Sequence, residues 1–161
     1  LGLQAQIKWP NDVVLNGKKL VGILTEMSAQ MNYIEYLVTG IGINANLREF
    51  PEELEDKATS LQKEIGHKVN RSALIAECME KIEENYEIFV KTQDLSGLMA
   101  AYQEALVNQD QQVRVLEPGH EYTGVARGIN AMGELLVEKE DGTITEVYAG
   151  EVSVRGLYGY V

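Results

Sequence analysis

The chain has 161 residues, enough for one domain or one and a half small ones, and 45% of them are hydrophobic, so we expect a real core. Aspartate and glutamate number 25 against 14 lysines and arginines, and the net charge of −11 excludes nucleic-acid binding except through a local patch. A single cysteine excludes an intrachain disulfide. No apolar run approaches the roughly 20 residues that cross a bilayer, and no signal peptide is visible. We therefore expect a cytoplasmic protein.

The first predicted element is a hairpin with a charged start. Residues 3–9 form a strand that leads into a Pro10-Asn11-Asp12 corner, where proline marks the exit because it cannot donate a ladder hydrogen bond. Two apolar runs, 13–15 and 19–27, then flank Asn16-Gly17, a dipeptide suited to the positive φ angles of a tight turn. The charged residues leave two interpretations open: a solvated hairpin rim, or a cationic site that holds anionic oxygens.

Another strand is predicted over 33–43. Its near-continuous apolar character indicates that both of its faces are covered. Gly40 and Gly42 carry no side chain, which lets a ligand or another backbone come close. Asn44 follows at the end of the strand. From the pattern alone an asparagine that caps a turn is favoured, and a side-chain amide aimed at a ligand is the alternative.

Helices are predicted in the middle of the chain. The acidic stretch 51–56 indicates a solvated surface turn, and 58–61 is expected to pack a short turn onto the sheet. Apolar residues at helical spacing then predict a long helix over 71–92 and a second one over 95–107, with Asp94 as its candidate cap. We expect both apolar stripes to face the core.

The last third of the chain predicts short strands. The apolar period changes from helical to two, and strands are expected at 112–116, 122–129, 134–138, 143–148 and 151–157. Several short strands at this spacing indicate a small barrel or sandwich. A unit of about fifty residues is near the lower limit for independent stability, so it should lean on the preceding helices.

Three sequence blocks together resemble the biotin protein ligases. In order they are Lys8-Trp9-Pro10-Asn11-Asp12, Lys19-Leu20-Val21-Gly22-Ile23-Leu24-Thr25-Glu26 and Gly40-Ile41-Gly42-Ile43-Asn44. The stretches 122–129 and 150–155 resemble the small C-terminal domain of that family. The five-residue Lys-Trp-Pro-Asn-Asp run is specific, whereas Gly-x-Gly-x-Asn alone would be weak.

The resemblance implies an α+β fold in two parts. Residues 1–108 would be the later part of a mixed-sheet catalytic domain, similar to class II aminoacyl-tRNA synthetases, and 109–161 would be an SH3-like barrel. The family carries a Gly/Arg-rich loop before the Lys-Trp-Pro-Asn-Asp run, and this loop forms much of the biotin pocket. No such loop occurs in the chain, which is therefore expected to be the C-terminal portion of a longer protein and inactive alone.

The implied reaction has two steps. The carboxylate of biotin attacks the α-phosphorus of ATP, giving biotinyl-5′-AMP and pyrophosphate, and a lysine of the biotin carboxyl carrier protein then takes the biotinyl group and releases AMP. ATP, biotin and Mg²⁺ are the implied ligands. Many bacterial members bind DNA through an N-terminal domain, which is not present in this chain. Homodimerisation stays open.

The resemblance also assigns residues. Lys19 would contact the carboxyl group of biotin and the α-phosphate, as the catalytic and biotin-binding lysine. The expected ATP contacts are Lys8, Asn11, Asn44 and Arg155. Asp12 would orient Lys8 or Asn11 or cap the corner, Trp9 would anchor the corner, and Lys18 should point to solvent because adjacent strand residues face opposite sides.

No metal site is predicted in the chain itself, since His67 and His120 lie far apart. Two alternatives stay open. One is another acyl-adenylate enzyme, such as a lipoate ligase. The other is a non-catalytic docking or dimerisation module.

Overall fold

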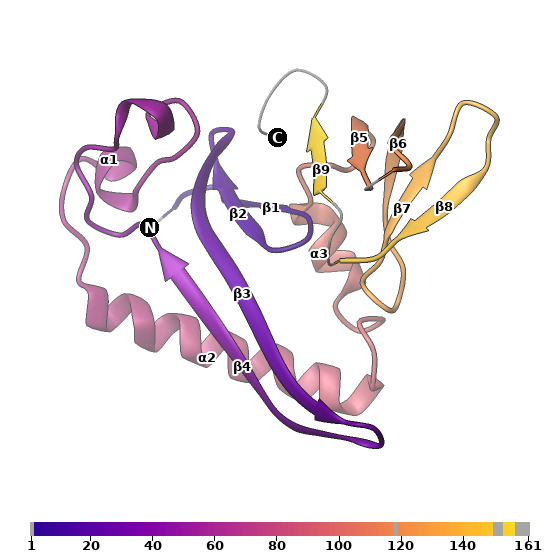
Figure 1. Ribbon diagram of the computed structural model, residues 1–161. Helices are drawn as coiled ribbons and strands as arrows, with labels where there is room; N and C mark the ends of the chain where they lie inside the picture. Colours follow the sequence, from indigo (N-terminus) through magenta and orange to yellow (C-terminus); the bar gives the residue numbers. More distant parts are fainter. Residues whose placement is uncertain (1, 118, 150–152, 157–161) are drawn as a thin grey trace.

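The computed structural model describes residues 2–117 and 119–149, together with the backbone of 153–156. Its strands form two antiparallel sheets (Figure 1). The first has the order β1-β2-β3-β4, with bounds Gln6–Lys8, Asp12–Leu15, Lys18–Gln30 and Tyr33–Ile43. The second has the order β8-β7-β6-β5-β9, with bounds, from β5 to β9, Gln112–Leu116, Tyr122–Ile129, Leu135–Glu138, Ile144–Val147 and Ser153–Gly156.

The helices lie between the two sheets in the sequence. They are the 3₁₀ turn η1 and the α-helices α1, α2 and α3, with bounds Glu52–Leu54, Leu61–Ile65, Arg71–Thr92 and Met99–Ala105. The predicted bounds of α2 are confirmed, whereas α3 is shorter than the predicted 95–107. The Asp94 carboxylate accepts hydrogen bonds from the N–H and hydroxyl of Ser96, which holds a turn there instead of capping a helix. No helix within the described residues is long and apolar enough to cross a membrane.

Trp9 joins the two sheets at the corner between β1 and β2. Its side chain is 1% exposed and packs in one core with residues of the second sheet, including Val113 and Val137. Its indole N–H donates to the Gly133 carbonyl at 2.9 Å, and its backbone N–H donates to the Asn108 side-chain oxygen at 3.1 Å. The role of anchor predicted for Trp9 is confirmed, and the five-stranded sheet leans on the first sheet through this residue.

Tyr102 of α3 belongs to the edge of the same core. Burial raises the pKa of its phenol to about 12, because the anion would lose its solvation. The second sheet itself is open within the described residues, so a closed SH3-like barrel is not part of the observed fold. Its inward positions alternate as predicted for half-buried strands, with Val113 and Val115 of β5 buried on either side of the exposed Arg114.

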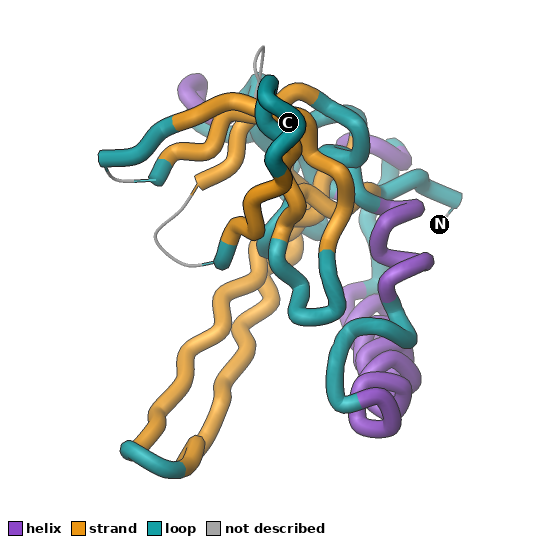
Figure 2. The backbone as a smooth tube through the Cα atoms, turned by 90° about the vertical axis from the view of Figure 1, so that its right-hand side faces the viewer, coloured by secondary structure: helices purple, strands orange, loops and turns teal. Residues whose placement is uncertain are grey.

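The β3–β4 hairpin extends well beyond the rest of its sheet and diverges from α2 (Figure 2). The prediction that both faces of 33–43 are covered is wrong for this structure. Only the base of the hairpin packs on a core, through Val21, Ile23 and Ile43. Further out the large apolar residues are exposed by 43–100%: Leu24, Met27, Met31, Tyr33, Ile34, Tyr36, Leu37, Val38 and Ile41.

The apolar stripe of α2 is exposed as well. No residue of this helix is buried, although Leu74, near its start, packs against the core under the hairpin base. The exposed residues of the stripe include Ile75, Met79, Ile82, Tyr86 and Phe89. The prediction that this stripe faces the core is therefore wrong for the described chain. Helical periodicity identified the helix and its apolar face, but it cannot say which part of a polypeptide covers that face.

We expect Trp9→Ala to lower the free energy of unfolding by about 3–5 kcal/mol, because it leaves a cavity in the core that joins the sheets. Trp9→Phe keeps most of the apolar contact and removes the indole donor, so its cost should be about 1–3 kcal/mol. Urea denaturation followed by circular dichroism measures both. Met132→Ala, at a side chain that is 76% exposed, is the control. A Trp9→Ala loss no larger than that of the control would contradict the anchoring role.

Candidate functional site

Four residues form a straight row across the first sheet. Lys8 on β1 stands opposite Asp12 on β2, Asp12 stands opposite Gly22 on β3, and Gly22 stands opposite Gly42 on β4. Directly opposed residues of antiparallel strands share a face of the sheet. The row therefore places two charged side chains beside two positions that have no side chain at all.

A β-bulge brings Lys19 to the face of this row. Val13 pairs with Val21, but the next residue of β2, Val14, pairs with Lys19, so Leu20 is an extra residue in β3. If Leu20 took a regular place in the ladder, strict alternation would put Lys19 on the face of Val21, away from Asp12. The bulge reverses the alternation, and Lys19 shares the face of Asp12 and Gly22.

The Lys19 ammonium lies over Gly22 and pairs with Asp12. Its Nζ is 2.5 Å from the Asp12 Oδ1. A Cβ built on Gly22 would be 3.0 Å from the Lys19 Cε and 3.1 Å from Nζ, so glycine leaves the room that the lysine occupies. The Lys19 side chain is 40% exposed, against 11% for Asp12. A nearly buried carboxylate thus orients an ammonium that an incoming anion can still reach.

The backbone of Lys19 is held from the other side by residues 57–59. The Lys19 N–H donates to the Lys57 carbonyl at 2.7 Å, and the Thr59 N–H donates to the Lys19 carbonyl at 2.9 Å. Residues 58–61 are all buried, which confirms that a short segment packs back onto the sheet. This segment lies along β3 beyond the end of β4, next to the bulge.

Asn44 lies beside the same bulge. Its N–H donates to the Leu20 carbonyl at 3.0 Å, and its carbonyl accepts from the Leu61 N–H at 2.9 Å. The strand end is thereby tied to both β3 and the start of α1, where helix N–H groups need acceptors. Asn44 comes two positions after Gly42, so it follows the bare positions of β4 at the end of the strand that is next to Lys19.

The other predicted site residues occupy different surroundings. Lys8 is only 4% exposed, next to Asp12 in the row. Asn11 uses its side-chain N–H to donate to the Ile23 carbonyl at 2.8 Å and so ties the corner to β3. Arg155 has its backbone in β9, opposite Arg114, and its side chain lies outside the described residues. The structure thus brings together Lys8, Asp12, Lys19 and Asn44 around β3.

Lys18 is not simply directed into solvent as predicted. It does face the opposite side from Lys19, paired with Leu15, but its ammonium donates to the Glu55 carbonyl at 2.9 Å. The acidic stretch around η1 is therefore attached to the hairpin.

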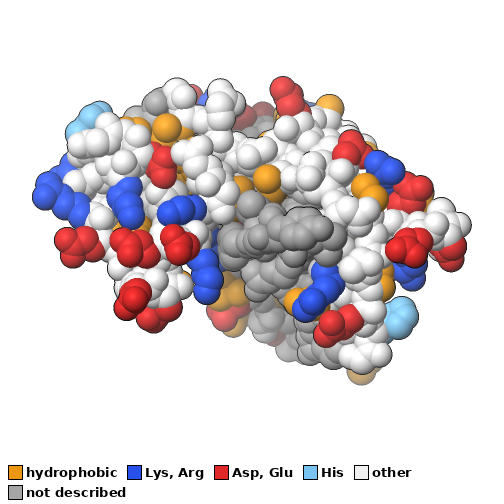
Figure 3. Space-filling model, turned by 90° about the horizontal axis from the view of Figure 1, so that it is seen from above, with side chains coloured by type: hydrophobic (Ala, Val, Ile, Leu, Met, Phe, Trp, Pro, Cys, Tyr) orange, Lys and Arg blue, Asp and Glu red, His pale blue; other side chains and the backbone are white. Residues whose placement is uncertain are grey.

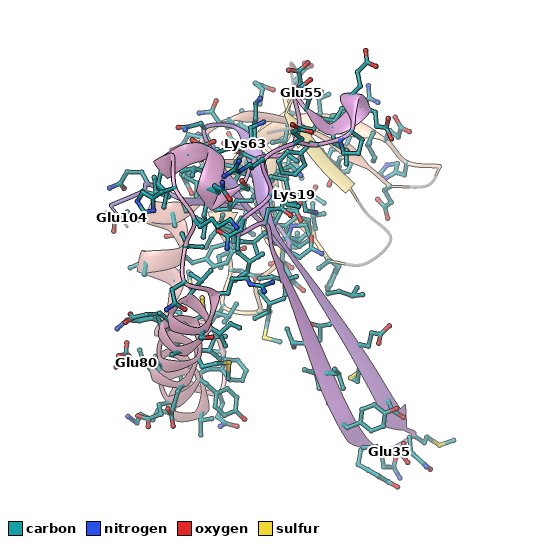
Figure 4. The ribbon with its side chains drawn as sticks, turned by 90° about the vertical axis from the view of Figure 1, so that its left-hand side faces the viewer. Lys19, Glu35, Glu55, Lys63, Glu80 and Glu104 are labelled. Atoms are coloured by element: carbon teal, nitrogen blue, oxygen red, sulfur yellow. The ribbon has the colours of Figure 1, made fainter. Side chains whose placement is uncertain are left out.

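Figure 4 shows Lys19 at the base of the β3–β4 hairpin and Glu35 at its far tip. Figure 3 shows basic and acidic side chains interspersed at the end of the molecule that carries α1.

Sequence reasoning missed three residues of this arrangement. Gly22 had a local signal, since an isolated glycine within a strand pattern suggests close approach. Asn108 and Glu64 had no such signal, because their partners Trp9 and Asn16 are distant in sequence.

No group of three or more His, Cys, Asp or Glu side chains that could hold a metal ion occurs in the part of the chain that the structure describes.

Comparison with known proteins identifies the two ends of the chain separately. Residues 1–44 match the model of the biotin/lipoate A/B protein ligase family, and residues 110–155 match that of the biotin protein ligase C-terminal domain. The bifunctional ligase/repressor BirA of Bacillus subtilis is 35% identical over 155 residues, which are 95% of this chain and 47% of that protein. The biotin–[acetyl-CoA-carboxylase] ligase of Mycobacterium tuberculosis is 30% identical, over 91% of this chain and 52% of its own. The chain thus spans about half the length of these relatives.

Solved structures give the same assignment. The apo biotin protein ligase from Aquifex aeolicus superposes with a TM-score of 0.83 at 33% identity, covering 94% of this chain and 65% of that one. The same Aquifex enzyme in complex with biotin and ATP superposes with a TM-score of 0.80 at 31% identity, covering 94% of this chain and 62% of that one.

We expect Gly22→Ala to displace the Lys19 ammonium from Asp12, because the new methyl group occupies the space beside Cε and Nζ. The free energy of unfolding should change by less than about 1 kcal/mol, since a partly exposed ion pair contributes little and the lysine end is flexible. A crystal structure of the variant measures the Nζ–Oδ1 distance. Gly40→Ala is the matched control, because its nearest heavy atom would be the Leu24 carbonyl oxygen at 3.8 Å. An unchanged ion pair in Gly22→Ala would contradict this account.

Proposed function

Because the chain belongs to the biotin protein ligase family, we propose that it forms the part of a biotin–[acetyl-CoA carboxylase] ligase in which the biotin carboxylate meets the α-phosphate of ATP. The observation that carries this proposal is the Lys19 ammonium, held by Asp12 over the bare backbone of Gly22. An oriented cation beside exposed strand backbone suits two anions that must approach each other.

Lys19 would act in the adenylation step. A lysine ammonium has three N–H donors, and Asp12 takes only one of them. The remaining donors can bind a carboxylate oxygen of biotin and an oxygen of the α-phosphate while the bond between them forms. As pyrophosphate leaves and biotinyl-5′-AMP is produced, the negative charge shifts between these oxygens. A donor set that is already oriented stabilises this charge without reorganising.

The glycines and Asn44 would shape the space for the ligands. Gly22 and Gly42 form a cross-strand pair without side chains, and Gly40 adds a third bare position on the same face. Substrate atoms can therefore lie close to the strand backbone, as the resemblance to the ligases leads us to expect. We assign the ATP contacts to Lys8, Asn11, Asn44 and Arg155. In the second step the amine of a carrier lysine attacks the biotinyl carbonyl carbon and AMP leaves.

Mg²⁺ fits this site only as a companion of the nucleotide. The one carboxylate of the row, Asp12, is engaged by Lys19, and no acidic cluster accompanies it within the described residues. Mg²⁺ commonly keeps several waters and binds through substrate phosphates, where it would neutralise the charge of the triphosphate. The residues of this chain would then hold and orient the anionic groups themselves.

We further propose the division into a catalytic part, 1–108, and a terminal part, 109–161, whose strands would belong to an SH3-like barrel. The biotin carboxyl carrier protein is the proposed macromolecular partner and the cytoplasm the proposed compartment. Any DNA binding would belong to a domain other than these two.

We expect Lys19→Ala in the intact ligase to slow adenylate formation by two or more orders of magnitude, about 3 kcal/mol in the barrier, because it removes a donor used in the transition state. Single-turnover formation of biotinyl-5′-AMP measures this directly. Lys18→Ala is the control, since its side chain faces the other side of the strand, and it should be near neutral. Unchanged single-turnover adenylation in Lys19→Ala would overturn the assignment.

The acyl group is tested separately. The family model matched by 1–44 includes lipoate ligases, whereas the domain matched by 110–155 is that of biotin ligases, which favours biotin. We expect the intact ligase to form an adenylate from biotin and not from lipoate when both are offered with ATP. Transfer of lipoate would support the lipoate-ligase alternative. Failure to form either adenylate would support a non-catalytic docking or dimerisation module.

A further inference from the structure

The two carboxylate oxygens of Glu64 bind two segments that meet at the start of β3. Oε1 accepts a hydrogen bond from the Thr59 hydroxyl at 2.5 Å, and Oε2 accepts one from the Asn16 side-chain amide at 2.8 Å. Hydrogen bonds to an ionised acceptor are roughly twice as strong as neutral ones. Glu64 therefore connects the β2–β3 turn to the segment that runs along the bulge.

One partner of Glu64 contacts Lys19, and the other lies in the turn that precedes it. Thr59 is 1% exposed, and its N–H donates to the Lys19 carbonyl at 2.9 Å. Asn16 occupies the turn with a φ of 51°, and the geometry of a hairpin turn sets the register of the strands that follow. The bulge at Leu20 comes immediately after this turn. Its position is thus fixed from the turn on one side and from residues 57–59 on the other.

Capping of α1 does not account for these contacts. Ser60 is the N-cap, and its Oγ accepts from the Lys63 N–H at 3.1 Å. A capping box would use the side chain of Lys63, the third helical residue, rather than that of Glu64. The other partner of Glu64, Asn16, lies outside α1 and is 48 positions away in the sequence.

We infer that Glu64 is a positioning residue for Lys19, acting through Thr59 and Asn16 on the bulge that turns the lysine toward Asp12. The inference rests on the proposed function, since it gives Glu64 a part in the reaction through the placement of Lys19. Glu64 itself touches neither reactant. Its loss should affect the rate of adenylation more than the affinity for substrates, because orientation matters most in the transition state.

The variants follow from the two hydrogen bonds. Glu64→Ala removes both of them. Glu64→Gln keeps an oxygen that can accept from Asn16 and gains an N–H that can donate to the Thr59 hydroxyl, so it should rescue the arrangement. Asn16→Gly suits the positive φ and removes only the contact to the turn. Glu53→Ala is the matched control, because it deletes an exposed carboxylate from the same region of the chain.

The first measurement is hydrogen exchange of single backbone amides in the intact ligase. In Glu64→Ala the amides of Lys19 and Thr59 should exchange at least about tenfold faster, while that of Val137 in the second sheet stays unchanged. Glu64→Gln and Glu53→Ala should stay within about threefold of the parent protein, and Asn16→Gly should fall between. Unchanged exchange at Lys19, or an equal rise at Val137, would overturn the inference.

The second measurement separates rate from affinity. Glu64→Ala should lower the kcat of adenylate formation by about tenfold and change the KM for ATP by less than about threefold, with Glu64→Gln restoring the rate. Faster exchange without a loss of kcat would refute the positioning role. If Lys19→Ala leaves adenylation unchanged, the proposed function fails, and the exchange of the Lys19 amide still decides whether Glu64 holds the bulge.

Discussion

The buried indole of Trp9 is the contact on which the arrangement depends, because it fixes the corner from which the functional row begins. Lys8 precedes it and Asp12 follows it closely, so the direction of both side chains is set by how this corner docks. The corner is held by the second sheet through the Gly133 carbonyl and by Asn108. The C-terminal strands thus contribute to the geometry of a site to which their own described side chains add no direct contact.

In the row across the first sheet, side chains of opposite charge stand next to each other. Burying an isolated ammonium or carboxylate would cost several kcal/mol, and placing Lys8 and Asp12 on neighbouring strands sets opposite charges side by side. Lys19 then adds a second cation that is only partly withdrawn from solvent. Lys8, Asp12 and Lys19 together carry one excess positive charge, on a chain whose net charge is −11. An anionic ligand would meet that local excess rather than the average surface.

Local features of the sequence were enough to predict most elements, because their signals are carried by neighbouring residues. The Asn16-Gly17 turn has the positive φ angles expected of it, and α2 has the predicted bounds, starting after the Asn70 cap. The burial of 33–43 and of the α2 stripe was mispredicted, since an apolar pattern does not reveal whether a covering partner belongs to the same chain. The contacts of Trp9 and Glu64 join residues remote in sequence, and no short pattern encodes them. Lys19 was identified by resemblance, but its face was set by a bulge that alternation alone could not predict.

The bulge sets three residues of β3, 19–21, against two residues of β2, so the direction of Lys19 depends on strand pairing and not on the identity of Leu20. Another apolar residue could fill the same place in the core under the hairpin and leave the lysine where it is. Loss of one residue from this stretch would close the bulge into a regular ladder, in which Lys19 would still lie opposite Val14 and on the face of Asp12. A regular ladder that kept all three residues 19–21 would instead turn Lys19 to the opposite face, so the bulge and the extra residue compensate for each other.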